Sequence, residues 1–326
     1  MTYATIALIL GIAALVWCAD RFVDGASGLA ARLGMPPLLI GMVVVGFGTS
    51  MPELMVSALA SLKGCSGFAL GNAFGSNIAN IALILGVSGM VSPVFVARGT
   101  LKRELPILTA ITLLAQWTLR DNFFSRLDAL VFLAVFAAWL GTDIMRAMRG
   151  RDAASTAATL ETAAPEKKSM SLGRSVAWLV VGIAGLAVSS RAIIWGAVEY
   201  AEFFHVGDLM IGLTVIAVGT SLPELASSVV AARRGEHDIA LGNVIGSNIF
   251  NTLAVVGLAG AIRPISADGL VFRRDIPISL ALTLALFVIG FNYRKSGDGR
   301  IGRSKALLLL AAYVAYTILL IRTSAA

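Results

Sequence analysis

Two short stretches of the chain place polar residues inside apolar runs. The first, "GFGTSMPELMVS" (Gly46–Ser57), lies in a run from 38 to 62 that carries no charge besides Glu53. The second, "AVGTSLPELASS" (Ala217–Ser228), places Glu224 171 residues later and agrees with the first at 7 of 12 positions. Neither run contains Lys or Arg. An unpaired carboxylate within a membrane normally faces a cavity or a partner. The matched glutamates therefore predict a bound cation.

A proline follows the Thr-Ser pair in each stretch. Pro52 and Pro223 lack an amide hydrogen and clash with the carbonyl four residues earlier, so each helix is expected to break there. Broken backbone at membrane depth is tolerated where it lines a polar cavity. The oxygen atoms offered to a cation are then freed carbonyls within 46–48 and 217–219 and the hydroxyls of Thr49, Ser50, Thr220 and Ser221.

A second motif, "LGNAFGSNIANI" (70–81), returns as "LGNVIGSNIFNT" (241–252) with 8 of 12 positions identical. Its polar residues recur every four positions and so share one helix face. In membranes Ser and Asn also join helices. We prefer ligation because the whole stripe is repeated beside a carboxylate motif. The stripe residues are Asn72, Ser76 and Asn80, and Asn243, Ser247 and Asn251.

Other residues of the second motif are assigned structural roles. Asn77 and Asn248 lie off the stripe, and the glycines are expected to let another helix approach closely. These glycines are Gly71, Gly75, Gly242 and Gly246.

The predicted ligand set contains two carboxylates with hydroxyl, amide and carbonyl oxygens. It suits Ca²⁺, which takes 6–8 oxygen ligands at flexible geometry, and Na⁺. It does not suit zinc or copper, because it contains no His or Cys. His205 and His237 fall in or beside loops and are interpreted as ordinary solvated residues. No cofactor is expected.

The elements that must position these residues are membrane helices. Of the 326 residues, 57% are hydrophobic and 14% charged, whereas soluble domains carry about 25% charged residues. Most of the apolar segments reach the ~17–25 residues that span a bilayer. The predicted fold is all-α with ten transmembrane helices, at roughly 4–20, 38–62, 66–91, 104–119, 127–147, 173–198, 209–232, 239–262, 275–292 and 304–321.

The chain is predicted to be two halves of one pattern. Residues 1–148 form the first five-helix repeat, 149–174 a polar cytoplasmic linker, and 175–326 the second repeat. An odd number of helices per half makes the second repeat enter the membrane from the opposite side. Such inverted repeats, with broken helices at a midplane site between them, are typical of secondary transporters.

Loop charges predict the orientation. Odd-numbered loops carry 17 Lys and Arg, and even-numbered loops with the termini carry 7. The positive-inside rule then places the odd loops in the cytoplasm and both termini outside. The net charge of +7 is thus assigned to membrane orientation, and no nucleic-acid partner is expected.

The four motif copies resemble the α-repeats of the calcium/cation antiporter superfamily, in particular bacterial inner-membrane sodium/calcium exchangers. The resemblance implies export of Ca²⁺ across the inner membrane in exchange for Na⁺ by alternating access. It implies ligands at Glu53, Glu224, Thr49, Ser50, Thr220, Ser221, Ser76, Ser247, Asn80 and Asn251, with carbonyls of Gly46 and Ala217, and includes Asn72 and Asn243 in the motif.

One departure from the family leaves the counter-ion open. Many sodium/calcium exchangers of this superfamily carry an aspartate where this chain has Asn251. A Ca²⁺/H⁺ exchanger with the same site is therefore an alternative, and a passive cation channel is a second one. An intramembrane protease is disfavoured, because no His lies in a predicted span and no G-x-S-x-G motif occurs. No oligomer is implied.

Overall fold

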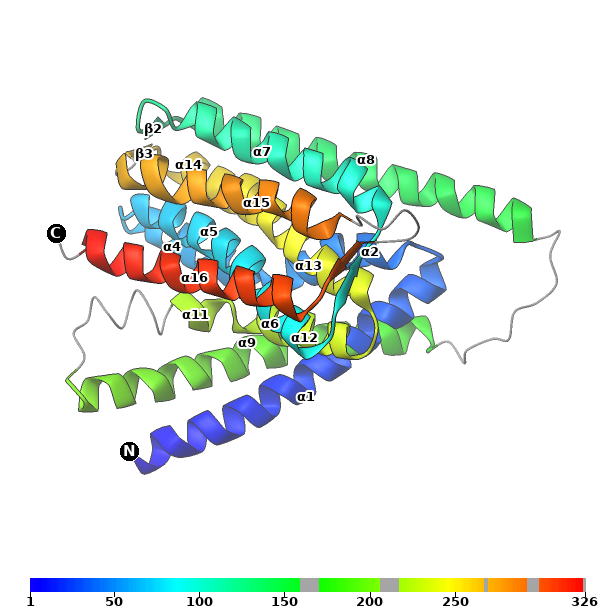
Figure 1. The fold of residues 1–326 in the computed structure, drawn as a ribbon, viewed down its shortest axis with the longest axis horizontal. Helices are drawn as coiled ribbons and strands as arrows, with labels where there is room; N and C mark the ends of the chain where they lie inside the picture. Colours follow the sequence, from blue (N-terminus) through cyan, green and yellow to red (C-terminus); the bar gives the residue numbers. More distant parts are fainter. Residues whose placement is uncertain (159–169, 206–216, 267–268, 292–298, 325–326) are drawn as a thin grey trace.

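The computed structural model describes residues 1–158, 170–205, 217–266, 269–291 and 299–324, and these are almost entirely helical (Figure 1). Several helices contain a π-helical segment, labelled η. The first half consists of α1 (Thr2–Leu33), α2 (Pro37–Ile40), η1 (Gly41–Val45), α3 (Gly46–Thr49), α4 (Met51–Leu62), α5 (Gly67–Ile78), η2 (Ala79–Ile84), α6 (Leu85–Val91), β1 (Val94–Val96), η3 (Thr100–Glu104), α7 (Leu105–Thr118), β2 (Phe123–Phe124) and α8 (Arg126–Ala158).

The second half repeats this order of elements. It consists of α9 (Leu172–Phe203), α11 (Ala217–Thr220), α12 (Leu222–Arg233), α13 (His237–Phe250), η5 (Asn251–Val255), α14 (Val256–Ile262), β3 (Ile265–Ser266), η6 (Val271–Asp275), α15 (Ile276–Gly290), β4 (Gly299–Ile301) and α16 (Arg303–Ser324).

Six described helices are long and apolar enough to cross a membrane. A seventh candidate is the pair 37–49 and 51–62, which is bent by 44° at the break between them. The two motif helices are the most buried of the six. In Gly67–Val91 and His237–Ile262, 72% and 83% of the apolar window is buried, so these helices form the centre of the bundle.

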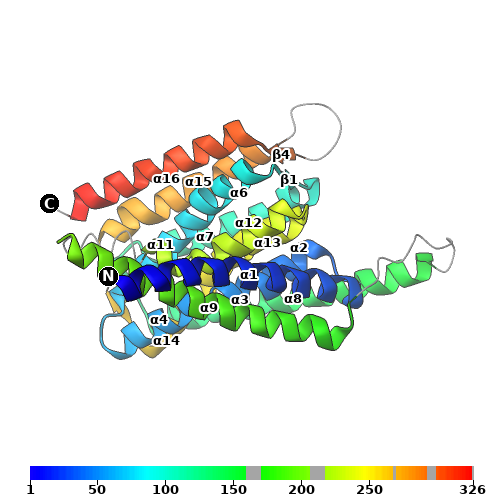
Figure 2. The same cartoon turned by 90° about the horizontal axis from the view of Figure 1, so that it is seen from below.

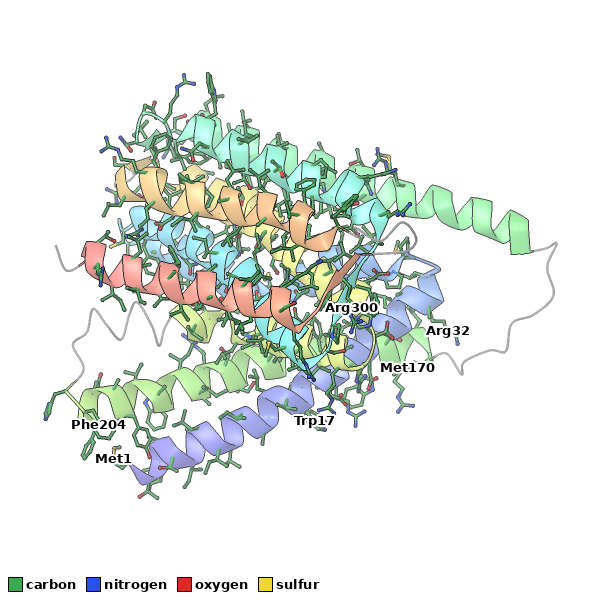
Figure 3. All side chains as sticks on the ribbon, in the orientation of Figure 1. Met1, Trp17, Arg32, Met170, Phe204 and Arg300 are labelled. Carbon is green, nitrogen blue, oxygen red and sulfur yellow. The ribbon has the colours of Figure 1, made fainter. Side chains whose placement is uncertain are left out.

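The equivalent helices α1 and α9 lie side by side and antiparallel (Figures 1 and 2). Met1 lies near Phe204 at one end of the pair, and Arg32 lies near Met170 at the other (Figure 3). Their glycine contacts are reciprocal under the 171-residue offset. A Cβ on Gly25 would meet Ser175 and Leu179, and one on Gly196 would meet the equivalent residues Ala4 and Leu8. The α1–α9 contact is therefore reciprocal, with equivalent residues of the two helices exchanging places.

Several other contacts between the halves follow the same exchange. Helix α8 packs on α14, and α16 packs on α6, its counterpart. Strand β1 pairs with β4 and strand β2 with β3, both antiparallel. Each half thus completes its packing with elements of the other half.

Two predicted boundaries differ from the structure. Helix α1 continues to Leu33, well past the apolar segment that ends near residue 20, and ends where Gly34 adopts a left-handed conformation (φ 61°). In this extension Arg21 pairs with Asp24, and Arg234 contacts the same aspartate. Helix α8 continues to Ala158, so the first residues of the predicted linker 149–174 are helical. Residues 159–169 of that linker, and 209–216 of the predicted seventh span, lie outside the described residues.

Candidate cation site

Each carboxylate motif contains the predicted helix break. The break falls at Ser50 between α3 and α4, and at Ser221 between α11 and α12, with nearly identical backbone angles (φ −86°, ψ 6° and φ −88°, ψ 6°). Pro52 and Pro223 lie in the first turn of the following helix, where a missing amide hydrogen costs nothing. On the second-repeat side, the Gly219 carbonyl accepts a hydrogen bond from Ser190 (2.7 Å).

Both glutamates follow directly after these breaks, in the first turn of α4 and of α12. The side chains of Glu53 and Glu224 are 0% and 2% exposed. Glu224 Oε1 accepts a hydrogen bond from Ser50, three residues before Glu53, so Glu224 lies beside the helix break that precedes Glu53. No Lys or Arg side chain forms an ion pair with either one within the described part of the chain. Two carboxyl groups without a cationic partner are therefore buried at the helix breaks.

The first asparagine of each stripe holds the glutamate of its own repeat. Asn72 Nδ2 donates to the Glu53 carbonyl (3.3 Å) and to Ser57 Oγ (3.0 Å). Asn243 Nδ2 makes the equivalent bonds to the Glu224 carbonyl (3.2 Å) and Ser228 Oγ (2.8 Å). The two amide nitrogens thus fix each motif helix against its broken helix.

Other hydrogen bonds join the two repeats at the site. Ser50 donates to Glu224 Oε1 (3.0 Å), and Thr49 donates to Asn243 Oδ1 (3.1 Å). Ser247 donates to the Gly46 carbonyl (3.3 Å), so this predicted ligand carbonyl lies beside the second motif helix. These bonds bring Thr49, Ser50 and Gly46 of the first repeat against three predicted ligands of the second, which are Asn243, Glu224 and Ser247.

Close backbone contact between α13 and the first repeat permits this meeting. A Cβ on Gly246 would overlap the backbone of Met42, and one on Gly242 would lie 3.0 Å from Gly41 Cα. This confirms the predicted close approach for the second-repeat glycines. For Gly71 and Gly75, no described atom lies within 4 Å of a Cβ position, and the equivalents of 41–45 fall in 212–216, outside the described residues.

Several predicted ligand oxygens are buried without a hydrogen-bond partner among the described residues. Leaving a buried polar group without a partner costs about 1–3 kcal/mol, and more for a charged group. Folded proteins therefore rarely tolerate such a cluster unless something binds it. The atoms are Glu53 Oε1 and Oε2, Glu224 Oε2, Ser221 Oγ, Asn80 Oδ1 and Asn251 Oδ1.

The off-stripe asparagines join the repeats, in the structural role predicted for them. Asn77 Nδ2 donates to Thr252 Oγ1 (2.8 Å), and Asn248 Nδ2 donates to the Asn77 carbonyl (3.4 Å). Asn248 Oδ1 also accepts from Asn80 Nδ2 (2.9 Å), which turns Asn80 so that its amide oxygen remains unpartnered.

The other predicted ligands fall on the same elements. Ser76 is 6% exposed on α5, and Thr220 ends α11 at the edge of a cavity. Helix α11 begins at Ala217, whose carbonyl was the second predicted backbone ligand. The described residues contain no group of three or more His, Cys, Asp or Glu that could hold a metal. The site relies on two carboxylates and neutral oxygens.

The sequence pattern of the family described as Sodium/calcium exchanger protein matches residues 3–145 and 174–322. One range lies in each half of the chain, and together the two ranges cover most of it. The chain belongs to the sodium/calcium exchanger protein family. It is therefore a membrane antiporter and not an enzyme, as the motifs predict.

Individual members of the family match over nearly their whole length. CaxA from Alkalimonas amylolytica is 42% identical over 98% of this chain and 99% of its own. Inner membrane protein YrbG from Escherichia coli (strain K12) is 38% identical over 98% of this chain and 97% of its own. The structure of the sodium-calcium exchanger NCX_Mj, soaked with 2.5 mM Na⁺ and 0.1 mM Ca²⁺, superposes with a TM-score of 0.80 at 29% identity, over 96% of each chain.

Some residues that support the candidate site are not among the predicted ligands. Ser57, Ser228 and Ser190 anchor the amides or carbonyls around the helix breaks. Ser57 and Ser228 end the two quoted stretches at equivalent positions, so the repeat alone could have identified them. Helix spacing could not predict the π-helical turns at Asn80 and Asn251, which lie within η2 and η5. Such turns are frequent at functional sites.

Proposed function

We propose that this exchanger exports Ca²⁺ from the cytoplasm in exchange for Na⁺ by alternating access to one site. The observation that carries the proposal is a set of buried oxygens on Glu53, Glu224, Ser221, Asn80 and Asn251 that have no hydrogen-bond partner among the described residues. Ca²⁺ or Na⁺ would satisfy these oxygens at once, because both are hard cations that prefer oxygen ligands.

The proposed ligand set contains every predicted site residue, at the breaks of both repeats and on the two motif helices. Glu53 and Glu224 would supply the charge. Neutral oxygens would complete the coordination, including those that now share hydrogen bonds across the site. The neutral ligands are Thr49, Ser50, Thr220, Ser221, Ser76, Ser247, Asn80, Asn251, Asn72 and Asn243, with the carbonyls of Gly46 and Ala217.

We also propose that the chain crosses the membrane ten times as two inverted repeats. To the six long helices and the bent pair we add α7, α12 and α15, each continuing from a short preceding helix. The antiparallel contact of the equivalent helices α1 and α9 supports inversion. A twofold axis perpendicular to membrane helices lies in the membrane plane, which is the inverted arrangement.

The charge bias predicts the topology of this arrangement. The linker should be cytoplasmic and both termini outside, because cytoplasmic loops carry the excess of Lys and Arg. A cysteine introduced at Ser171, in a background without Cys18 and Cys65, should resist an impermeant thiol reagent in intact cells. A cysteine at Ala325, beyond the described residues, should react. The reverse pattern would invert the topology, and reaction at both positions would contradict the helix count.

Saturable flux that strictly requires a counter-ion tests the exchange itself. Liposomes that contain the purified protein and are loaded with Na⁺ should take up Ca²⁺ from a Na⁺-free medium, because outward movement of Na⁺ drives inward movement of Ca²⁺. They should show no Ca²⁺ flux when both the Na⁺ and the pH gradient are absent. Flux driven by the Ca²⁺ gradient alone would indicate a channel. Flux that follows a pH gradient and ignores Na⁺ would indicate a Ca²⁺/H⁺ exchanger with the same site.

Asn251 bears on the stoichiometry. Its amide is fully buried without a partner in the described structure, and the site carries only the charges of Glu53 and Glu224. One Ca²⁺ or two monovalent ions would neutralise these two charges. A third monovalent ion would leave a buried net positive charge, which is costly without another negative group.

We therefore expect wild type to exchange about two monovalent ions per Ca²⁺, by the charge balance above. Asn251→Asp should raise this number toward three, because it adds one negative charge. The reversal potential of Ca²⁺ flux in liposomes measures the ratio, with Na⁺ and pH gradients imposed separately. Asn248→Asp is the comparison, since Asn248 already bonds Asn77 and Asn80 between the repeats. A wild-type ratio of three, unchanged in Asn251→Asp, would contradict the charge count.

A further inference from the structure

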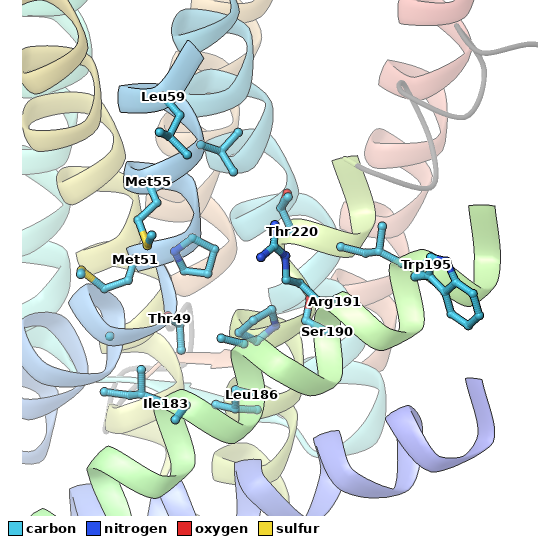
Figure 4. Close-up of a pocket in the computed structure, with 17 residues that line it drawn as sticks. Thr49, Met51, Met55, Leu59, Ile183, Leu186, Ser190, Arg191, Trp195 and Thr220 are labelled. Carbon is cyan, nitrogen blue, oxygen red and sulfur yellow. The ribbon is translucent and has the colours of Figure 1, made fainter. Parts of the chain in front are cut away.

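The two flanks of the site differ although the repeats are equivalent. On one flank α12 packs along α1. On the equivalent flank a cavity of about 670 Å³ separates α4 from α9 (Figure 4). The cavity is lined by Thr49 and Thr220 at the site and extends to Leu59 and Trp195. One flank is therefore closed and the other open, and the open one leads toward the ends of α4 and α9.

Three charged residues hold the closed flank together. Arg234, at the end of α12, lies 2.5 Å from Asp20 Oδ1 through Nη2 and pairs with Asp24 through Nη1. Both aspartates lie on α1. Arg21 also pairs with Asp24, at 3.3 Å, so the cluster contains two cations and two anions. These bonds tie the end of one helix to the middle of the other.

The open flank carries different charges at the equivalent positions. In the other repeat, 171 residues away, the position of Asp20 is occupied by Arg191 and that of Asp24 by Trp195. The position of Arg234 is occupied by Lys63. Arg191 projects from α9 into the space facing α4 (Figure 4). Neither Arg191 nor Lys63 forms an ion pair with any described residue. Closing this flank as the other is closed would bring two cations together.

We propose that Arg234, Asp20 and Asp24 form an electrostatic latch that keeps the α1–α12 flank closed, and that the α4–α9 flank has no such latch. The inference rests on alternating access as proposed above, with the latched flank facing the cytoplasm. The exchanger is thus biased toward the state that opens outward. Entry of cytoplasmic Ca²⁺ requires the three side chains to separate.

The latch should shift the conformational equilibrium modestly. The side chains of Arg234, Asp20 and Asp24 are 30%, 35% and 27% exposed, so water and salt screen their pairing. Two such pairs together bias an equilibrium by about 3- to 10-fold. A bias of this size changes the populations of the two states while leaving both accessible during transport.

Cysteine labelling measures this bias directly. In a Cys18→Ala, Cys65→Ser background, Val230→Cys reports on the latched flank, and the equivalent Leu59→Cys reports on the open one. In inside-out vesicles Arg234→Gln should raise the rate at which an impermeant maleimide labels the Val230 cysteine by about 3- to 10-fold, as estimated above. Asp20→Asn with Asp24→Asn should do the same, and all three changes together should add nothing further.

Matched variants keep the test decisive. Arg233→Gln removes the neighbouring exposed charge, which has no described ion-pair partner, and should leave the labelling rate unchanged. Arg234→Lys keeps the charge and should stay near wild type, which separates the latch from misfolding. Equal rates for Arg234→Gln and Arg233→Gln, while both reporters still respond to Ca²⁺, would overturn the latch alone. Reporters that ignore Ca²⁺ would overturn alternating access and the latch with it.

Discussion

Glu53→Gln and Glu224→Gln are each expected to reduce Ca²⁺ transport in liposomes by at least about 100-fold. Removing one member of a buried, closely matched set of charges costs about 3–5 kcal/mol, which is a factor of 100 or more in affinity. Both carboxylates are almost fully buried, and no described cation side chain pairs with them. A divalent ion would therefore lose half of its neutralising charge in a medium that screens poorly.

The stability of these variants separates a lost ligand from a lost fold. In the empty protein the two carboxylates repel each other, so neutralising one should leave the melting temperature unchanged or raise it. Ca²⁺ should raise the melting temperature of wild type and not that of either variant. Glu202→Gln makes the same chemical change on an exposed glutamate of α9 and should behave as wild type. Near wild-type flux in Glu53→Gln or Glu224→Gln would exclude that residue as a ligand.

Gly246→Ala is expected to abolish transport through packing rather than charge. The added Cβ would lie 2.5 Å from Met42 Cα and 2.8 Å from Met42 C, and neither backbone atom can rotate away. Overpacking of a tight interface costs about 1–3 kcal/mol. Helix α13 would have to move away from η1, and this would carry Asn243 and Ser247 away from Thr49 and Gly46.

Gly141→Ala on α8 is the matched control, because no described atom lies within 4 Å of its Cβ position. Alanine is favoured over glycine in a helix interior by about 0.5–1 kcal/mol, so this control should be as stable as wild type or slightly more stable. Thermal melting in detergent and Ca²⁺ flux in liposomes measure both variants. Wild-type flux in Gly246→Ala would contradict the prediction, because it would show that transport does not require the close contact of α13 with η1.

Much of the candidate site could be predicted because glutamate and proline are unusual residues within an apolar run. A glutamate beside a proline in an apolar run has few structural uses, and its repetition at Glu224 removes the remaining ambiguity. The helix breaks at Ser50 and Ser221 follow from proline geometry alone. The hydrogen bond from Ser50 to Glu224 joins the two repeats, as expected for a predicted site that lies between them.

Other features depend on packing between distant segments and could not be predicted from spacing. The pairing of Asp24 on α1 with Arg234 joins residues that lie 210 positions apart in the chain. The open and closed flanks are built from equivalent segments of the two repeats, and only the assembled structure shows which of them is closed. Likewise, only the packing shows that Gly46 is contacted by Ser247.

The exchange of elements between the halves makes them sequence repeats but not autonomous folding units. Strand β1 of the first half pairs with β4 of the second. Helix α16 of the second half packs on α6, and α8 of the first half packs on α14. A chain cut between α8 and α9 would thus yield two fragments that mature only when both reach the same membrane. An ancestor of half this length would have faced the same requirement, and could have met it by assembling with a second copy of itself as a twofold homodimer.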